Sequence, residues 1–251
     1  MSATLQRQEA QLAAIDTLGR MFNNPLHSDL TLRCLGKEWH VHKIMVCAQS
    51  PFFAKACEGS FREATENVIT LRDDDPDVVA AMLGYLYTFE YADSHDLTFN
   101  VHVHIIADKY DLPPLAKLAT TKFAAAAKTA WSSSSFAEAA ALIFTDSTAI
   151  SKELREGVIA TASTHARSLK LDPAGASFRD VVSATPALAM ALWCAQDSGV
   201  GVEASNPPGL LFACPYSCGH KLSPAQLNGL YIKCPLCSLS AFRDQWELNT
   251  A

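Results

Sequence analysis

Short stretches of alternating or continuous apolar residues mark the first part of the chain. Residues 30–34 read Leu-Thr-Leu-Arg-Cys, a period of two that predicts a half-buried strand. Gly36-Lys37 predicts a turn, and residues 38–42 predict the returning strand of a hairpin. Residues 67–71 carry apolar side chains on both faces and predict a third short strand. These patterns together predict a small sheet early in the chain.

Two helices are predicted from their start signals. Ser50-Pro51 predicts one start, because serine caps a helix and the N–H that proline lacks is not needed in the first turn. Phe52-Phe53 follows at once, so this helix is expected to enter the core. Asp73-Asp74-Asp75-Pro76 suggests a cation site, but a cap at Asp75 with carboxylates at the positive helix end explains it more simply. The expected buried face of this second helix holds Val79, Met82, Leu83 and Leu86.

Helical patterns also cover the N-terminus and the second half of the chain. Ser135 and Glu138 fit a capping box. Residues 198–208 are rich in glycine, serine and proline and predict a linker. Apolar periodicity predicts helices over 137–144, 150–168, 178–182 and 186–196. An amphipathic N-terminal helix is predicted from Leu5, Leu12, Ile15, Leu18 and Phe22.

An ordered series of motifs gives the most specific signal. Its members are Ser28-Asp29-Leu30-Thr31-Leu32, Val41-His42-Lys43, Ser50-Pro51-Phe52-Phe53, Phe61-Arg62-Glu63, Tyr85-Leu86-Tyr87-Thr88, Glu90-Tyr91 and Ala107-Asp108-Lys109-Tyr110-Asp111-Leu112 with Leu115. In order and spacing the series resembles the BTB/POZ domain, a protein-interaction module, over residues 28–127. The resemblance implies an α+β class and the BTB/POZ fold, a short mixed sheet flanked by helices.

The resemblance also implies a division of the chain. Residues 1–27 would hold the N-terminal helix, 28–127 the BTB/POZ domain, 128–197 a helical BACK-like extension, 198–208 the linker and 209–251 a zinc-ribbon-like module. Fungal proteins that combine a lone BTB/POZ domain with a helical tail and a cysteine-rich end are the most similar in architecture. In long-form BTB domains the N-terminal helix packs on the partner subunit, which implies a homodimer; the alternative is that it packs on its own domain.

Four residues are candidates for partner binding. Phe61 and Glu63 match the hydrophobic-x-Glu pattern with which cullin-3 adaptors engage the ligase scaffold. Asp29 and Lys43 match positions that form a charged pocket in BTB repressors. The expected function is therefore dimerisation and partner recruitment, with a role as a cullin-3 ubiquitin ligase adaptor. The alternative is a transcriptional regulator or co-repressor scaffold, although tandem C-x2-C/H-x3-H fingers are absent from the sequence.

The cysteines fall into two groups. Cys214-x3-Cys218 and Cys234-x2-Cys237 form two close pairs that can surround one tetrahedral Zn²⁺. The ion would be structural, because four thiolates leave no open position for water. Alternatives are two disulfides, ordinary thiols, or His220 in place of Cys218. The remaining four are expected to be buried thiols in apolar segments: Cys34, Cys47, Cys57 and Cys194.

Composition and motif searches argue against several other classes. The formal charge is -6 with no basic tract, so nucleic-acid binding is not expected. No apolar run approaches the about 20 residues that span a membrane, and an intracellular protein of nucleus or cytoplasm is expected. Ser94-His95-Asp96 holds the residue types of a hydrolase triad, but a fold, not adjacency in sequence, assembles a triad. No enzymatic activity is expected.

Overall fold

The computed structural model describes residues 3–58, 62–93, 96–145 and 150–197, and in the C-terminal part 211–213, 221–222, 231–233, 236–237, 240–242 and 247–249. The chain divides into two compact units, Met1–Ser198 and Gly199–Ala251. The predicted linker over 198–208 lies outside the described residues.

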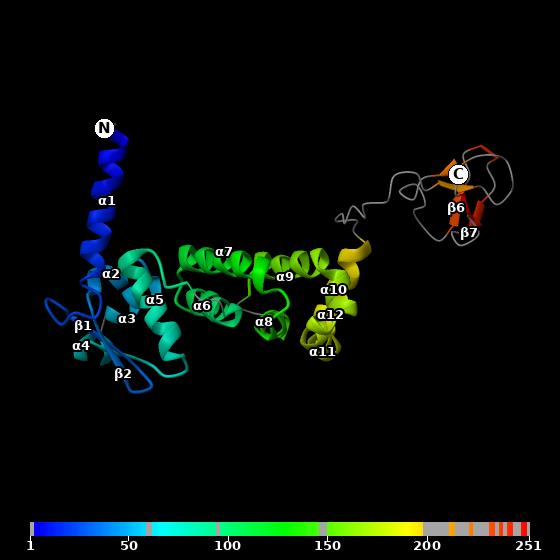
Figure 1. The fold of residues 1–251 in the computed structure, drawn as a ribbon. Coiled ribbons are helices and arrows are strands. Elements are labelled where there is room, and N and C mark those ends of the chain that lie inside the picture. Colours follow the sequence, from blue (N-terminus) through cyan, green and yellow to red (C-terminus); the bar gives the residue numbers. More distant parts are fainter. Residues whose placement is uncertain are drawn as a thin grey trace. The chain divides into compact units, whose positions relative to one another are not determined.

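The first unit holds a small sheet and many helices (Figure 1). Its strands are β1 (Leu30–Cys34), β2 (Lys37–Val41) and β3 (Val68–Leu71). Its α-helices are α1 (Ala3–Gly19), α2 (Lys43–Cys47), α3 (Pro51–Cys57), α4 (Arg62–Glu66), α5 (Pro76–Thr88), α6 (Leu97–Lys109), α7 (Pro113–Ala130), α8 (Ser134–Thr145), α9 (Lys152–Thr164), α10 (Ala166–Leu171), α11 (Ala176–Ala184) and α12 (Pro186–Asp197). The predicted strands and helices of this unit are thus present, but the helix predicted over 150–168 is divided at His165 into α9 and α10.

The sheet is mixed, with strand order β2-β1-β3. β1 pairs antiparallel with β2 and parallel with β3. The hairpin turn is Leu35-Gly36, with φ of 43° and 86°, so the predicted turn at Gly36-Lys37 was one residue late. A two-residue hairpin turn of this kind needs positive φ at both central residues, which makes Gly36 the second of them and places Lys37 opposite Cys34.

Two apolar cores share the helix pair α6 and α7. The first core joins the sheet to α5 and takes Val103 and Ile106 from α6. The second core joins α8, α9 and α11 and takes Leu97 and Val101 from α6. Helix α7 also contributes to both cores, with Leu115 and Ala119 in the first and Phe123 and Ala127 in the second. Figure 1 shows α6 and α7 running side by side from the region of α5 to that of α8 and α9. The helical extension therefore packs on α6 and α7, which connect it to the sheet.

Two of the three predicted caps are confirmed. The Ser50 hydroxyl accepts the Phe53 N–H at 3.3 Å, and the Asp75 carboxylate accepts the N–H groups of Asp77 and Val78. The capping box at Ser135 was wrong: Ser135 lies inside α8, and Ser133 accepts the Phe136 N–H instead.

Ser135 has a different role, at the start of α6. Its hydroxyl accepts the Leu97 N–H at 2.8 Å and donates to Asp96 at 2.6 Å. Burial acts to raise the pKa of Asp96, but hydrogen bonds from Ser135 and Thr98 outweigh it and lower the pKa below its ordinary value. Ser135 therefore ties α8 to the N-terminus of α6.

Helix α1 is shorter than the apolar pattern implied. It ends at Gly19, and Phe22 lies in the turn that follows. The N–H groups of Met21 and Phe22 bond back to Leu18 and Gly19, which closes the helix with tight turns. Phe22 thus reaches the core from outside the helix.

The four scattered cysteines do not share one environment. Cys34 is buried, Cys47 and Cys57 are half-buried, and Cys194 is exposed, so the prediction of a buried Cys194 was wrong. Burial raises the pKa of Cys34, and burial together with the Cys57 side chain raises the pKa of Cys47 to about 12. Because the thiolate is the reactive form, Cys34 and Cys47 are poor nucleophiles.

The second unit contains short strands. β4 (Leu211–Ala213) pairs antiparallel with β5 (Lys221–Leu222) and β8 (Glu247–Asn249), and β6 (Tyr231–Lys233) pairs antiparallel with β7 (Ser240–Phe242). Within the described residues of the whole chain, no helix has the length and apolar character that crossing a membrane requires.

Candidate partner-binding site

Asp29 and Lys43 lie together at the corner where β1 begins and α2 starts. The Asp29 carboxylate accepts the backbone N–H of Lys43 at 2.7 Å, and the Lys43 ammonium donates to the Asn67 side-chain oxygen. Asn67 has a left-handed φ of 55° just before β3. The corner therefore joins three segments of the sheet region, and both predicted polar groups have partners within the chain.

Of the other predicted pair, only Glu63 belongs to the described residues. Phe61 lies outside them. Glu63 is exposed in the first turn of α4, and no residue of this short helix is buried. Glu63 is therefore available to a partner.

Helix α1 presents apolar side chains to solvent along its first ten residues. Leu5 is 44% exposed and Leu12 is 63% exposed. Toward the other end of the helix, Leu18 is half-buried, and after it the Phe22 ring lies 5.6 Å from the ring of Tyr87. Figure 1 shows the start of α1 standing clear of the other helices of its unit. The helix is thus anchored at one end and uncovered at the other.

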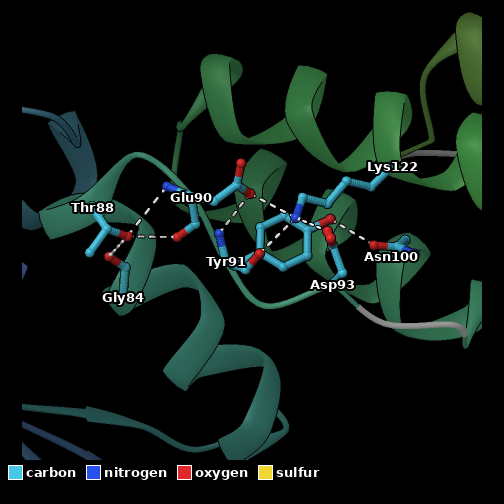
Figure 2. Close-up of polar contacts among 7 residues, drawn as sticks. All are labelled: Gly84, Thr88, Glu90, Tyr91, Asp93, Asn100 and Lys122. Atoms are coloured by element: carbon cyan, nitrogen blue, oxygen red, sulfur yellow. Dashed lines mark hydrogen bonds and ion pairs between the residues drawn. The ribbon is translucent and has the colours of Figure 1, made fainter. Parts of the chain in front are cut away.

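The connection between α5 and α6 is held by Lys122 of α7 (Figure 2). The Lys122 ammonium contacts the Glu90 carboxylate at 2.7 Å, the Asp93 carboxylate at 2.5 Å and the Tyr91 carbonyl at 2.7 Å, and it lies 4.4 Å from the centre of the Tyr91 ring. The Tyr91 hydroxyl donates to Asn100 at 2.7 Å. Burial acts to lower the pKa of Lys122, but the two carboxylates outweigh it and raise the pKa.

This cluster is structural. Three oxygen atoms surround an ammonium that has three N–H donors, and the Lys122 side chain is only 14% exposed. The Lys122 ammonium therefore has no N–H donor left for a partner protein.

A second buried cluster was not predicted as a unit. The Asp74 carboxylate accepts from Lys109 at 2.8 and 2.9 Å and from the Tyr110 hydroxyl at 2.5 Å, while the Cys34 thiol donates to the Asp74 carbonyl at 3.1 Å. Burial, and then the hydrogen bond to Asp74, raise the pKa of Tyr110. The Tyr110 ring also stacks on Phe53 at 5.3 Å. The cluster joins the start of α5 to the end of α6.

The histidines and the serine-histidine-aspartate triplet do not assemble a catalytic group in the described part of the chain. His42 is buried, with one ring nitrogen 2.9 Å from the Tyr87 hydroxyl and the other 3.1 Å from the Leu26 carbonyl. Asp96 caps α6, and Ser94-His95 lies outside the described residues. His42 and Asp96 therefore have local structural roles.

The cysteine pairs fall in the connections of two antiparallel strand pairs. Cys214 and Cys218 lie in the sequence between β4 and β5, and Cys234 and Cys237 lie between β6 and β7. Cys237 is half-buried, and the other three lie outside the described residues.

Comparison with known proteins concerns part of the first unit. Residues 18–126 match the family model of the BTB/POZ domain. This part of the chain is therefore similar to a BTB/POZ domain. "TD and POZ domain-containing protein 3" of Mus musculus is 35% identical over 103 residues, which are 41% of this chain and 28% of that protein. "TD and POZ domain-containing protein 4" of Mus musculus is 32% identical over 98 residues, 39% of this chain and 26% of that protein.

Two solved BTB domains are similar at lower identity. The BTB domain of zebrafish PATZ1 is 13% identical, with a TM-score of 0.36, and covers 48% of this chain and 93% of its own. The BTB domain of human Gigaxonin is 20% identical, with a TM-score of 0.34 and the same coverages. This chain spans about a quarter of the length of the curated relatives that it matches. The resemblance to fungal chains stays a prediction.

Proposed function

We propose that this chain is a self-associating interaction protein that forms a homodimer through α1 and the BTB/POZ domain and recruits a second protein. BTB/POZ domains are protein-interaction modules. The observation that carries the proposal is the uncovered apolar surface of α1, formed by Leu5 and Leu12, on a helix whose other end is fixed to the core. Burying such side chains in a second copy gains roughly 25 cal/mol per Å² of apolar surface.

A charge on this surface is expected to separate the subunits. Leu12→Glu should raise the dimer dissociation constant at least about tenfold, because a carboxylate would have to leave water at the interface. The fold should survive, since Leu12 is 63% exposed. The measurement is light scattering across a dilution series. A point change is cleaner than deleting residues 1–24, which would also remove Phe22 from the core.

Gln11→Glu is the matched control, because Gln11 is the exposed neighbour of Leu12 on the same helix. It should leave the dissociation constant within about twofold. A Leu12→Glu protein that associates as tightly as the wild type would remove α1 from the interface.

Within this function, we propose cullin-3 as the recruited partner. Phe61-Arg62-Glu63 carries the adaptor pattern, and Glu63 is exposed on α4. If Phe61 inserts into an apolar pocket of the scaffold, Glu63 adds a polar contact at the rim. The chain would then serve as a ubiquitin ligase adaptor.

Truncating the anchor tests this partner. Phe61→Ala is expected to weaken binding of the full chain to the purified cullin-3 N-terminal domain by about thirtyfold, the loss of about 2 kcal/mol at a buried aromatic anchor. Phe89→Ala is the matched control, because Phe89 is a phenylalanine elsewhere in the first unit that is 50% exposed. Titration calorimetry gives the dissociation constants of the wild type and both variants. Absence of binding by the wild type, or equal affinities for all three proteins, would refute cullin-3 as the partner.

The transcriptional alternative has weaker support. A charged pocket built on Asp29 and Lys43 would need free polar groups, but Asp29 accepts the Lys43 N–H and the Lys43 ammonium is bonded to Asn67. A co-repressor that binds there would first have to displace these contacts.

We also propose that one structural Zn²⁺ holds the second unit together. Support comes from the strand pairs: each cysteine pair lies in the connection of one antiparallel pair, and all the strands are only two or three residues long. Cys214, Cys218, Cys234 and Cys237 would supply four thiolates, the donor set of a closed zinc site.

A further inference from the structure

One cavity in the described residues lies between α6, α7 and the start of α9, and no residue of α1 or α4 lines it. Its volume is about 660 Å³, within the size range of pockets that hold ligands or partner side chains. Its apolar wall is formed by Ala107, Leu112 and Ile150, all buried, with Ala116 partly exposed beside them. The cavity thus offers an apolar floor.

The buried histidine in this cavity is fully used by the fold. His104 Nε2 accepts the Ser151 N–H at 3.3 Å, which leaves the proton on Nδ1, and Nδ1 lies 3.2 Å from both the Ala116 carbonyl and the Thr120 hydroxyl. Neither nitrogen is available as a base or a metal ligand. The described residues also hold no group of three or more side chains that could bind a metal ion. Acid–base catalysis by His104 and binding of a divalent cation in this cavity are therefore disfavoured.

The rim of the cavity is acidic. Asp108 at the end of α6, Asp111 in the α6–α7 connection and Glu153 in the first turn of α9 are exposed, and Lys117 is the cation beside them. None of the ion pairs in the described part of the chain uses these four side chains. Uncompensated carboxylates around an apolar floor attract cations and favour an amphipathic cationic ligand.

We propose that this cavity binds an extended peptide segment of a partner protein, in which an apolar side chain is flanked by arginine or lysine. The three carboxylates lie on α6, on the α6–α7 connection and on α9. Cationic side chains spaced along a peptide can therefore pair with them better than one compact ion can. The apolar residue would enter the floor near Leu112 and Ile150. This inference rests on the proposed function as an interaction protein, and it adds the chemistry of one recruited segment.

The test uses the full chain and the labelled heptapeptide Gly-Arg-Arg-Leu-Arg-Arg-Gly in a fluorescence anisotropy titration. The wild type should bind this peptide. Replacing the central leucine by serine, or the arginines by glutamates, should each weaken binding at least about tenfold. Asp111→Asn combined with Glu153→Gln should also weaken it about tenfold, because two rim charges are lost. Asparagine also tolerates the left-handed φ of 54° at position 111.

Glu138→Gln combined with Asp180→Asn is the matched control, because it removes two exposed carboxylates elsewhere on the same unit. It should leave the affinity unchanged. Equal weakening by the two double variants, or no binding by the wild type, would overturn the peptide site. Light scattering of the same samples reports self-association separately, so failure of this inference is distinguishable from failure of the proposed function.

Discussion

Asp74→Ala is expected to lower the free energy of unfolding of the first unit by about 2–4 kcal/mol. The Asp74 side chain is 8% exposed and accepts from both Lys109 and Tyr110. Its removal leaves the buried Tyr110 hydroxyl without this acceptor and separates the start of α5 from the end of α6. Lys109, at 43% exposed, can turn its ammonium to water, which keeps the loss below that of a fully buried pair.

Urea denaturation followed by circular dichroism measures this change. Asp73→Ala is the matched control, since Asp73 is the exposed neighbour in the same acidic triplet, and it should shift stability by less than about 0.5 kcal/mol. Equal effects of the two substitutions would mean that the Asp74 cluster contributes nothing specific.

Removal of the proposed zinc is expected to unfold the second unit and leave the first intact. A unit of this size buries little apolar surface on folding, and binding of structural zinc by small domains is worth about 10–16 kcal/mol. Cys234→Ser should have the same effect as a chelator, because it removes one thiolate. Hydrogen exchange resolved by peptide should show lost protection only beyond residue 198.

Cys194→Ser is the control for this experiment, because Cys194 is an exposed cysteine outside the proposed zinc site. It should keep both the zinc content and the protection of the second unit. Elemental analysis should give one zinc per chain. Less than about half a zinc per chain under reducing conditions, with the second unit still protected, would contradict a structural metal.

Local patterns in the sequence predicted the elements of the first unit well. Alternation over residues 30–34 and the Ser50 and Asp75 caps depend on interactions between residues near one another in the chain, so spacing alone reveals them. The one-residue error at the hairpin turn arose because a leucine, Leu35, occupies a left-handed position that a pattern search assigns to glycine.

Contacts between distant segments could not be predicted in this way. Ser135 fits a capping box by spacing, but its hydroxyl bonds to Asp96 and Leu97, almost forty positions earlier. Asp74 was expected only to help a helix start, yet its partners are Lys109 and Tyr110. The packing of α8 against α6 brings Ser135 to Asp96, and the packing of α5 against α6 brings Asp74 to Lys109.

For the candidate sites, too, the sequence revealed local features but not contacts between distant segments. The motif series found the sheet corner, and the structure brings Asp29 and Lys43 together there. The acidic rim of the α6–α7–α9 cavity gave no sequence signal, because Asp108 and Asp111 are separated from Glu153 by two helices. Such a surface exists only once the helical extension has packed on the BTB/POZ domain.

The mass of the intact chain in solution tests the central claim most directly. Sedimentation velocity at micromolar concentration should give twice the chain mass of 27.1 kDa, because α1 and the BTB/POZ domain would join two copies. A single species at 27.1 kDa across that concentration range would contradict self-association.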